Sequence, residues 1–221
     1  MLQPVLHQLN SQRLVLASGS PRRKQILENI GLKFDVIPSN FEENLDKSSF
    51  KHPADYARET AKRKALEVAK RLQGSDNPAD LVIGADTVIT QDDMLFEKPS
   101  NKEHAREMLT KFSGGSHFVC TGVILVAPKA SKVYKGTQSI DDFSITEFDS
   151  RTEVFMSKLS QEVIDAYVET GESFDKAGGY GIQAVGGTLI EGIKGDYFNV
   201  MGFPLHKFCV ELMKIYNRPD K

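Results

Sequence analysis

An apolar segment in the first half of the chain does most to limit the fold. Residues Leu81-Val82-Ile83-Gly84-Ala85 carry no polar side chain, and the apolar pattern resumes at Val88-Ile89 after Asp86-Thr87. Such a run is typical of a central strand that is buried on both faces, a position found where helices cover both sides of a sheet. Helical patterns precede and follow this run along the chain. The sequence therefore predicts an α/β fold.

The remaining pattern alternates between the two kinds of element before it becomes rich in strands. Strands are expected at residues 14–17, 33–37, 95–98, 117–126 and 145–156, and helices at residues 21–30, 53–72, 100–113 and 160–171 and from about residue 204. Ser100 and Glu103 form a capping box for the third helix. The polar segment 130–142 is expected to be disordered or tolerant of insertions. A length of 221 residues fits one α/β domain or two lobes that share a cleft.

Composition excludes several classes of protein. The chain is 40% hydrophobic and 26% charged, with a formal net charge of -2, which argues against disorder and against a broad nucleic-acid surface. Its two cysteines, Cys120 and Cys209, lie far apart in apolar segments, so packed thiols in a reducing compartment are favoured over a disulfide. Met1–Asn10 lacks the continuous apolar segment typical of a secretory signal, and no stretch approaches the length needed to span a bilayer. We expect a cytoplasmic protein with no membrane or nucleic-acid partner.

Two arginines stand where a helix end is already positive. In Ser18-Gly19-Ser20-Pro21-Arg22-Arg23, Ser20 is a good N-cap and Pro21 suits the first helical position. Arg22 and Arg23 then fall in the first turn, where free N–H groups and the helix dipole repel cations unless an anion joins them. A phosphate-bearing ligand explains this arrangement. A surface helix whose arginines pair with carboxylates explains it equally well.

Two further charges interrupt apolar patterns. Asp86 lies within the central strand, where a buried carboxylate needs a partner, a metal or a proton. The alternative is a structural aspartate that accepts backbone N–H groups, although Gly84 nearby would admit a ligand or another backbone. Lys64 shares its helix face with Ala57, Ala61 and Val68, so it points inward unless its long stem carries the ammonium to solvent.

Weaker signals come from three other places. A hairpin would return Lys98 to the neighbourhood of Asp86, either as a substrate ligand or as a simple ion pair. Glu43, in an acidic loop, is a second carboxylate of the kind that a divalent cation shared with phosphates requires. The glycine-rich stretch Gly178–Gly181 either brings backbone close to a planar base, with Gln183 at its edge, or makes a tight turn.

Four motifs in order resemble the Maf family of nucleoside triphosphate pyrophosphatases. They are Ser18-Gly-Ser-Pro-Arg-Arg, Gly84-Ala-Asp-Thr, Glu97-Lys-Pro and Asp175-Lys-Ala-Gly-Gly-Tyr-Gly-Ile-Gln. The resemblance implies a mixed β-sheet flanked by helices, with two lobes around a deep cleft, as one domain over residues 1–221. It also implies hydrolysis of a nucleoside triphosphate to monophosphate and pyrophosphate with a divalent cation (Mg²⁺, Mn²⁺ or Co²⁺), and a homodimer.

The resemblance also assigns roles by position. Asp86 matches the catalytic base, and Glu43 and Asp86 match the metal site. The expected substrate-binding residues are Ser18, Ser20, Arg22, Arg23, Lys64, Thr87, Lys98 and Gln183. Arg, Thr and Gln at the positions of Arg22, Thr87 and Gln183 are typical of the subgroup that acts on dTTP and UTP. The competing hypothesis is a regulatory protein of cell division that binds nucleotides without significant hydrolysis.

Overall fold

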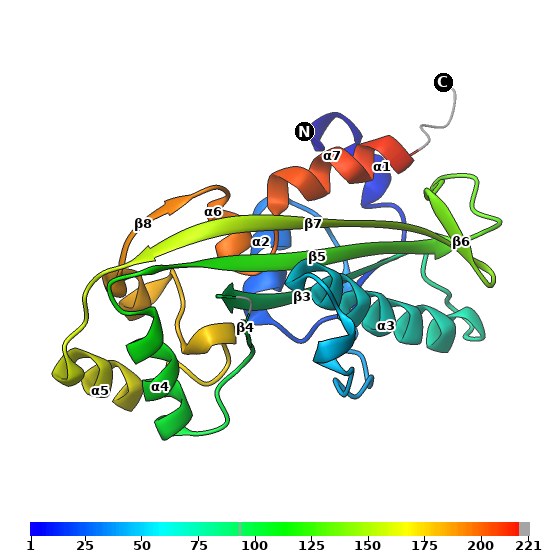
Figure 1. Ribbon diagram of the computed structural model, residues 1–221. Coiled ribbons are helices and arrows are strands. Elements are labelled where there is room, and N and C mark those ends of the chain that lie inside the picture. The colour runs from blue at the N-terminus through cyan, green and yellow to red at the C-terminus, as the bar shows by residue number, and fades with distance from the viewer. Residues whose placement is uncertain (93, 217–221) are drawn as a thin grey trace.

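A single mixed sheet organises the chain. The computed structural model describes residues 1–92 and 94–216, so the prediction of one domain over 1–221 includes Asp93 and residues 217–221, which lie outside the described residues. The strand order is β2-β1-β3-β5-β7-β6, with β4 paired to β3 and β8 to β7 (Figure 1). The strands are β1 (Leu14–Leu16), β2 (Asp35–Val36), β3 (Leu81–Gln91), β4 (Met94–Phe96), β5 (Ser116–Pro128), β6 (Gln138–Ile140), β7 (Phe143–Met156) and β8 (Ile190–Lys194).

Helices cover both faces of this sheet, which confirms the predicted α/β class with a mixed sheet (Figure 1). The α-helices are α1 (Leu6–Leu9), α2 (Pro21–Asn29), α3 (Pro53–Gln73), α4 (Lys102–Phe112), α5 (Gln161–Glu169), α6 (Tyr197–Val200) and α7 (Leu205–Ile215). Short 3-10 helices are η1 (Gln3–Val5), η2 (Lys47–Ser49), η3 (Ala177–Gly179) and η4 (Ala184–Leu189). Strand β1 pairs in parallel with β2 and β3, whereas the other pairings are antiparallel. Within the described residues, no helix is long and apolar enough to cross a membrane.

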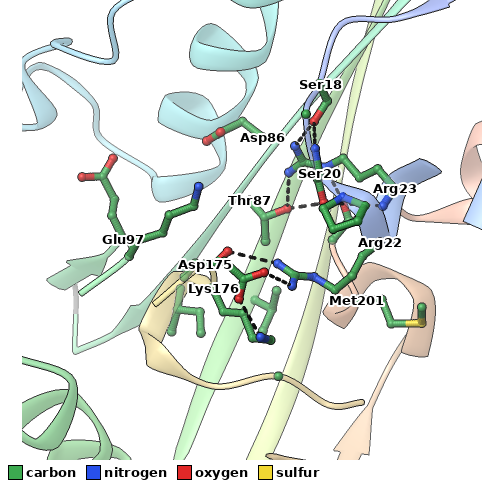
Figure 2. Close-up of a pocket in the computed structure, with 18 of the residues that line it drawn as sticks. Ser18, Ser20, Arg22, Arg23, Asp86, Thr87, Glu97, Asp175, Lys176 and Met201 are labelled. Atoms are coloured by element: carbon green, nitrogen blue, oxygen red, sulfur yellow. Dashed lines mark hydrogen bonds and ion pairs between the residues drawn. The ribbon is translucent and has the colours of Figure 1, made fainter. Parts of the chain in front are cut away.

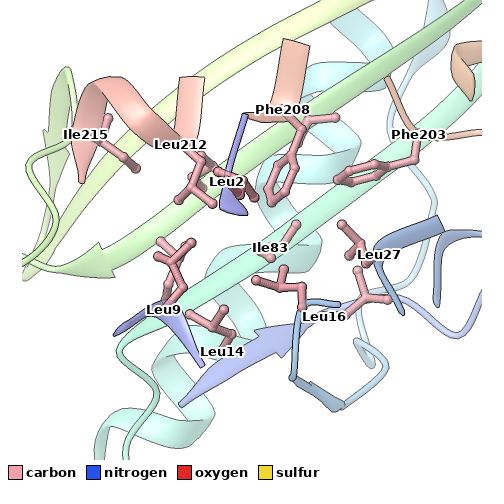
Figure 3. Packing of buried hydrophobic residues seen from close by; sticks show 14 of the residues in the cluster. Leu2, Leu9, Leu14, Leu16, Leu27, Ile83, Phe203, Phe208, Leu212 and Ile215 are labelled. Atoms are coloured by element: carbon pink, nitrogen blue, oxygen red, sulfur yellow. The ribbon is translucent and has the colours of Figure 1, made fainter. Parts of the chain in front are cut away.

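Alternate residues of the central strands feed two different cores, because successive side chains of a strand point to opposite faces. Leu16 and Ile83 pack with Leu27 of α2 and with Phe208 and Leu212 of α7 on one face (Figure 3). The neighbouring positions in the same strands pack against α3 on the other face. The prediction of a strand buried on both sides is therefore confirmed.

Helix α3 approaches the sheet at two glycines. A Cβ atom at Gly84 of β3 would lie 2.7 Å from the Ala65 Cβ and 2.8 Å from the Ala61 carbonyl oxygen. At Gly122 of β5, a Cβ would meet the Arg58 backbone nitrogen at 2.5 Å. The space next to Gly84 is thus taken by a helix backbone. This close approach fixes the height of α3 above the strand that carries Asp86.

A second apolar cluster lies farther along the strands. Helices α4 and α5 pack there with β8 around Phe112, next to Val119 of β5, whereas Val123 of the same strand belongs to the first core. Residues from both clusters line one cavity, namely Met201 from the first and Ile89 and Tyr180 from the second. The cavity therefore lies between two lobes.

Several local predictions need correction. Segment 130–142 is not structureless, because residues 138–140 form β6 against β7 and Tyr134 is buried at 1% exposure. The strand expected over 33–37 is confined to Asp35–Val36, at the edge of the sheet. Helix α4 is capped by the Asn101 side chain, which accepts from the His104 backbone N–H, and so Ser100 is not the cap.

Candidate functional site

One cavity of about 640 Å³ collects all ten predicted site residues. Its walls come from the start of α2, the loop before η2, helix α3, strand β3, the segment after β4, the glycine-rich loop (residues 175–183) and the turn after α6. The predicted residues that line it are Ser18, Ser20, Arg22, Arg23, Glu43, Lys64, Asp86, Thr87, Lys98 and Gln183. Residues separated by more than half the chain therefore face a common space. Their chemical roles remain predictions.

The start of α2 has the predicted N-cap. Ser20 is extended, and its Oγ accepts from the Arg23 backbone N–H at 3.5 Å. Arg22 turns toward the glycine-rich loop, where its Nη1 donates to Asp175 Oδ2 at 2.8 Å and its Nη2 to the Asp175 carbonyl at 3.1 Å. The alternative of an arginine paired with a carboxylate thus describes Arg22, although this pair lines the cavity.

Arg23 is held by neutral oxygens instead. Its guanidinium donates to Ser18 Oγ at 2.9 Å, to Thr87 Oγ1 at 3.0 Å and to the Gly202 carbonyl at 2.9 Å (Figure 2). Burial lowers the pKa of Arg23, and the nearby Asp86 carboxylate opposes that shift. An arginine held in this way keeps its charge available to an anion, because no carboxylate of the described residues is bonded to it.

Asp86 lies where β3 passes below α3. Its Oδ1 is 2.9 Å from Lys64 Nζ, and the same ammonium is 2.8 Å from Glu43 Oε1. Burial raises the pKa of Asp86, while the charges of Lys64 and Arg23 lower it and only partly offset the burial. Lys64 does point inward, with 14% of its side chain exposed. The buried carboxylate therefore has cationic partners and a proton affinity above that of an ordinary aspartate.

Lys98 and Gln183 lie at the wall and have no side-chain partner among the described residues. Lys98 is exposed and lines the cavity, yet in the described part of the chain it forms neither an ion pair nor a hydrogen bond. The simple Asp86–Lys98 ion pair is therefore absent, and Lys64 takes that place. The Gln183 side-chain amide is likewise unpaired among residues 1–92 and 94–216. Both groups are free to meet a ligand.

Three charged residues of the cavity were not predicted as site residues. Asp175 and Lys176 face it from the glycine-rich loop, with Lys176 Nζ 2.6 Å from Asp175 Oδ1 (Figure 2). Glu97 accepts from the Tyr56 hydroxyl at 2.7 Å and pairs with Lys47. All three stand inside the quoted motifs, which is the sequence signal that could have found them. The partners of Asp175 and Glu97 include residues of distant segments, whereas Lys176 contacts its own loop.

The carboxylates of Glu43 and Asp86 face one point, the Lys64 ammonium. Within the described residues, no group of three or more His, Cys, Asp or Glu side chains forms a closed metal site. Mg²⁺ is commonly bound by one or two carboxylates together with substrate phosphates and water. The two carboxylates fit a cation that arrives with a phosphate ligand, rather than one that the protein holds alone.

Comparisons with known proteins agree on one family. A family model described as Maf-like protein matches residues 13–215. A human "Probable bifunctional dTTP/UTP pyrophosphatase/methyltransferase protein" is 50% identical over 220 residues, which are 99% of this chain and 34% of the human protein. A dTTP/UTP pyrophosphatase of Clostridium perfringens (strain 13 / Type A) is 44% identical, covering 88% of this chain and 93% of that protein. A dTTP/UTP pyrophosphatase of Bacillus anthracis is 40% identical, covering 91% and 94%.

Proposed function

The chain belongs to the Maf-like protein family, and from that premise we propose that it hydrolyses nucleoside triphosphates, with dTTP and UTP as preferred substrates. The products are the nucleoside monophosphate and pyrophosphate. Relatives that this chain covers at 93% and 94% of their length carry the name dTTP/UTP pyrophosphatase. The chain spans about a third of the length of the human relative.

The observation that carries the proposal is that cationic side chains gather around one buried carboxylate. Arg22, Arg23, Lys64 and Lys98 all line the cavity that contains Asp86. A triphosphate brings several negative charges, and preorganised cations stabilise the further charge that develops on a departing pyrophosphate. A site built only to hold a neutral ligand has no use for this arrangement.

Asp86 is the proposed general base. A water molecule attacks the α-phosphorus, its proton passes to a carboxylate oxygen of Asp86, and the bond between the α-phosphorus and the bridging α–β oxygen breaks. Pyrophosphate leaves with the electron pair of that bond. The raised pKa of Asp86 brings its proton affinity closer to the working pH, which favours a general base.

A divalent cation, Mg²⁺, Mn²⁺ or Co²⁺, would be held by Glu43 and Asp86 together with the phosphates. When bound, it neutralises charge on the triphosphate. The Lys64 ammonium, which contacts both carboxylates, would then contact the phosphate oxygens.

Base selection is proposed for Arg22 and Gln183, with Thr87 in a supporting position. The Gln183 amide offers a donor and an acceptor to the edge of a pyrimidine. The Thr87 hydroxyl is already engaged with Arg23 and lies 3.0 Å from Thr121 Oγ1. Thr87 thus orients Arg23 more than it reads the base.

We further propose that residues 1–221 form one catalytic domain, and that the protein is a homodimer in the cytoplasm. Two free thiols, Cys120 and Cys209, suit a reducing compartment. A net charge of -2 gives no support to nucleic acid as a partner.

The test is a panel of canonical and modified triphosphates, each assayed for pyrophosphate with Mg²⁺, Mn²⁺ and Co²⁺. We expect pyrophosphate and monophosphate in equal amounts, fastest with dTTP and UTP. Saturable nucleotide binding with no pyrophosphate under any metal would reject the enzyme and support the regulatory alternative.

A further inference from the structure

Glu172 lies just behind the glycine-rich loop, outside the cavity wall, and binds backbone. Its Oε1 accepts from the Gly186 N–H at 3.0 Å and from the Tyr167 hydroxyl at 3.2 Å. Its Oε2 accepts from the Val185 N–H at 3.3 Å. A half-buried carboxylate with two N–H donors from one turn fixes the path of that turn.

The turn that Glu172 binds follows Gln183 directly. Ala184 has a left-handed backbone conformation, with φ of 54°, which costs energy in a residue other than glycine. At Gly186, a Cβ would stand 2.2 Å from the Gly181 carbonyl oxygen, so the turn packs tightly against the glycine-rich stretch. Because the Gln183 amide has no partner among the described residues, its direction depends on the backbone that Glu172 holds.

The same short segment reaches the other side of the cavity. Lys176 Nζ donates to the Glu172 carbonyl at 2.6 Å and to Asp175 Oδ1 at 2.6 Å. Asp175 Oδ2 in turn holds Arg22 (Figure 2). Residues 172–176 therefore contain both Glu172, which binds the turn after Gln183, and Asp175, which binds Arg22.

We propose that Glu172 is a positioning residue for base selection, which acts by fixing the turn that aims Gln183 into the cavity. This inference rests on the proposed function, because it assigns Gln183 to the nucleobase. Glu172 itself touches no substrate.

The test compares UTP with CTP in Glu172→Gln. The amide retains one acceptor but presents its NH₂ group to one of the two N–H donors, so the turn loses a charge-assisted bond. We expect the ratio of kcat/KM for UTP over CTP to fall about tenfold, mainly through a higher KM for UTP, with kcat within about twofold of the wild type. Glu169→Gln is the matched control, since Glu169 binds Lys102 and Arg106 away from the cavity and should leave the ratio unchanged.

A purely structural role would give a different result. The ratio would stay at its wild-type value, or kcat would fall equally for both nucleotides, and either outcome overturns the proposal. In a Gln183→Ala background, Glu172→Gln should not change the ratio further, whereas independent effects would add. If Glu172→Gln fails to fold, Glu172→Asp keeps the charge with a shorter reach, and we expect a fall of about threefold.

A binding measurement separates this inference from the proposed function. Calorimetric Kd values for UTP and CTP, taken without added metal, require no turnover. If the wild type binds UTP more tightly than CTP but releases no pyrophosphate, only the proposed function is rejected. If the wild type hydrolyses UTP and the Glu172→Gln variant still binds UTP more tightly than CTP by the wild-type ratio, only the role of Glu172 is rejected.

Discussion

Lys64 of α3 and Asp86 of β3 form a largely buried ion pair of 2.9 Å, with 14% and 11% of their side chains exposed. The pair joins the helix that packs on the central strand to the one carboxylate of that strand. Glu43 shares the same ammonium. Lys64 therefore lowers the proton affinity of Asp86, the proposed base. The phosphates of the proposed substrate compete with Asp86 and Glu43 for the same ammonium.

The pH dependence of kcat/KM should report this pair, because that quantity reflects the pKa values of the free enzyme. Burial raises the pKa of Asp86 and Lys64 lowers it, so the acid limb of the wild type should lie above the range of an ordinary aspartate. Lys64→Met removes the lowering charge and should move the acid limb to higher pH. Lys62→Met, on the same helix but paired with Glu59 and Glu147, is the control. An acid limb that stays in place in Lys64→Met would remove Asp86 as the titrating base.

Thr87→Val tests the support of Arg23. Valine matches threonine in shape but leaves Arg23 Nη2 without its acceptor, whereas Thr121 Oγ1 keeps the Asn199 carbonyl at 3.3 Å. We expect a loss of about 1–3 kcal/mol in the free energy of unfolding, because a charged donor goes unsatisfied, and a lower kcat/KM for UTP. Urea denaturation and steady-state kinetics measure the two effects. The exposed Thr110 of α4 supplies the control Thr110→Val, and equal behaviour of the two variants would contradict the assigned role.

Gly84→Ala tests the contact between α3 and the sheet. The new methyl group would stand 2.7 Å from the Ala65 Cβ, so helix or strand must move. Overpacking of this kind costs about 1–3 kcal/mol, which lowers Tm by roughly 2–4 °C per kcal/mol in a chain of this length. Activity should fall as well, because the movement separates Lys64 from Asp86. Gly74→Ala, where nothing lies within 4 Å, should change neither quantity. An unchanged Tm in Gly84→Ala would show that the close approach is not a constraint.

The local pattern of the sequence could predict this arrangement only in part. The periodicity of α3 placed Lys64 on the apolar face, and the run through β3 placed Asp86 in the sheet, because both follow from spacing within one element. The cap at Ser20 likewise depends on neighbours. Such features need no knowledge of the rest of the fold.

Contacts between distant segments could not be predicted. Arg22 and Asp175 are 153 residues apart, and nothing in either segment indicates the other. The Gly202 carbonyl that holds Arg23 is a backbone group, which leaves no trace in side-chain pattern. The cap at Asn101 instead of Ser100 was missed because both residue types cap well, and only the path of the chain chooses between them.

His117 should make the folded state sensitive to acid. Its imidazole is buried, with Nε2 2.5 Å from the Tyr180 hydroxyl, and burial lowers its pKa from 6.5 to about 4. As pH falls below 6.5, the unfolded chain binds a proton that the folded chain refuses until about pH 4, so stability is lost across this window. The loss is about 3 kcal/mol at most.

The measurement is the free energy of unfolding in urea at pH 7 and pH 4.5. The wild type should lose more stability between these values than His117→Gln, which has no imidazole to protonate. His206→Gln changes an exposed histidine and should behave as the wild type. A wild type and a His117→Gln variant with the same pH dependence would mean that His117 is not kept neutral by the fold.

The most direct test of the central claim is the hydrolysis of UTP in water labelled with oxygen-18. Attack on the α-phosphorus with Asp86 as base places the label in UMP and leaves pyrophosphate unlabelled, and Asp86→Asn should bind UTP while turnover falls by about 10² or more. Label in pyrophosphate, release of UDP with orthophosphate, or full turnover by Asp86→Asn would contradict the account.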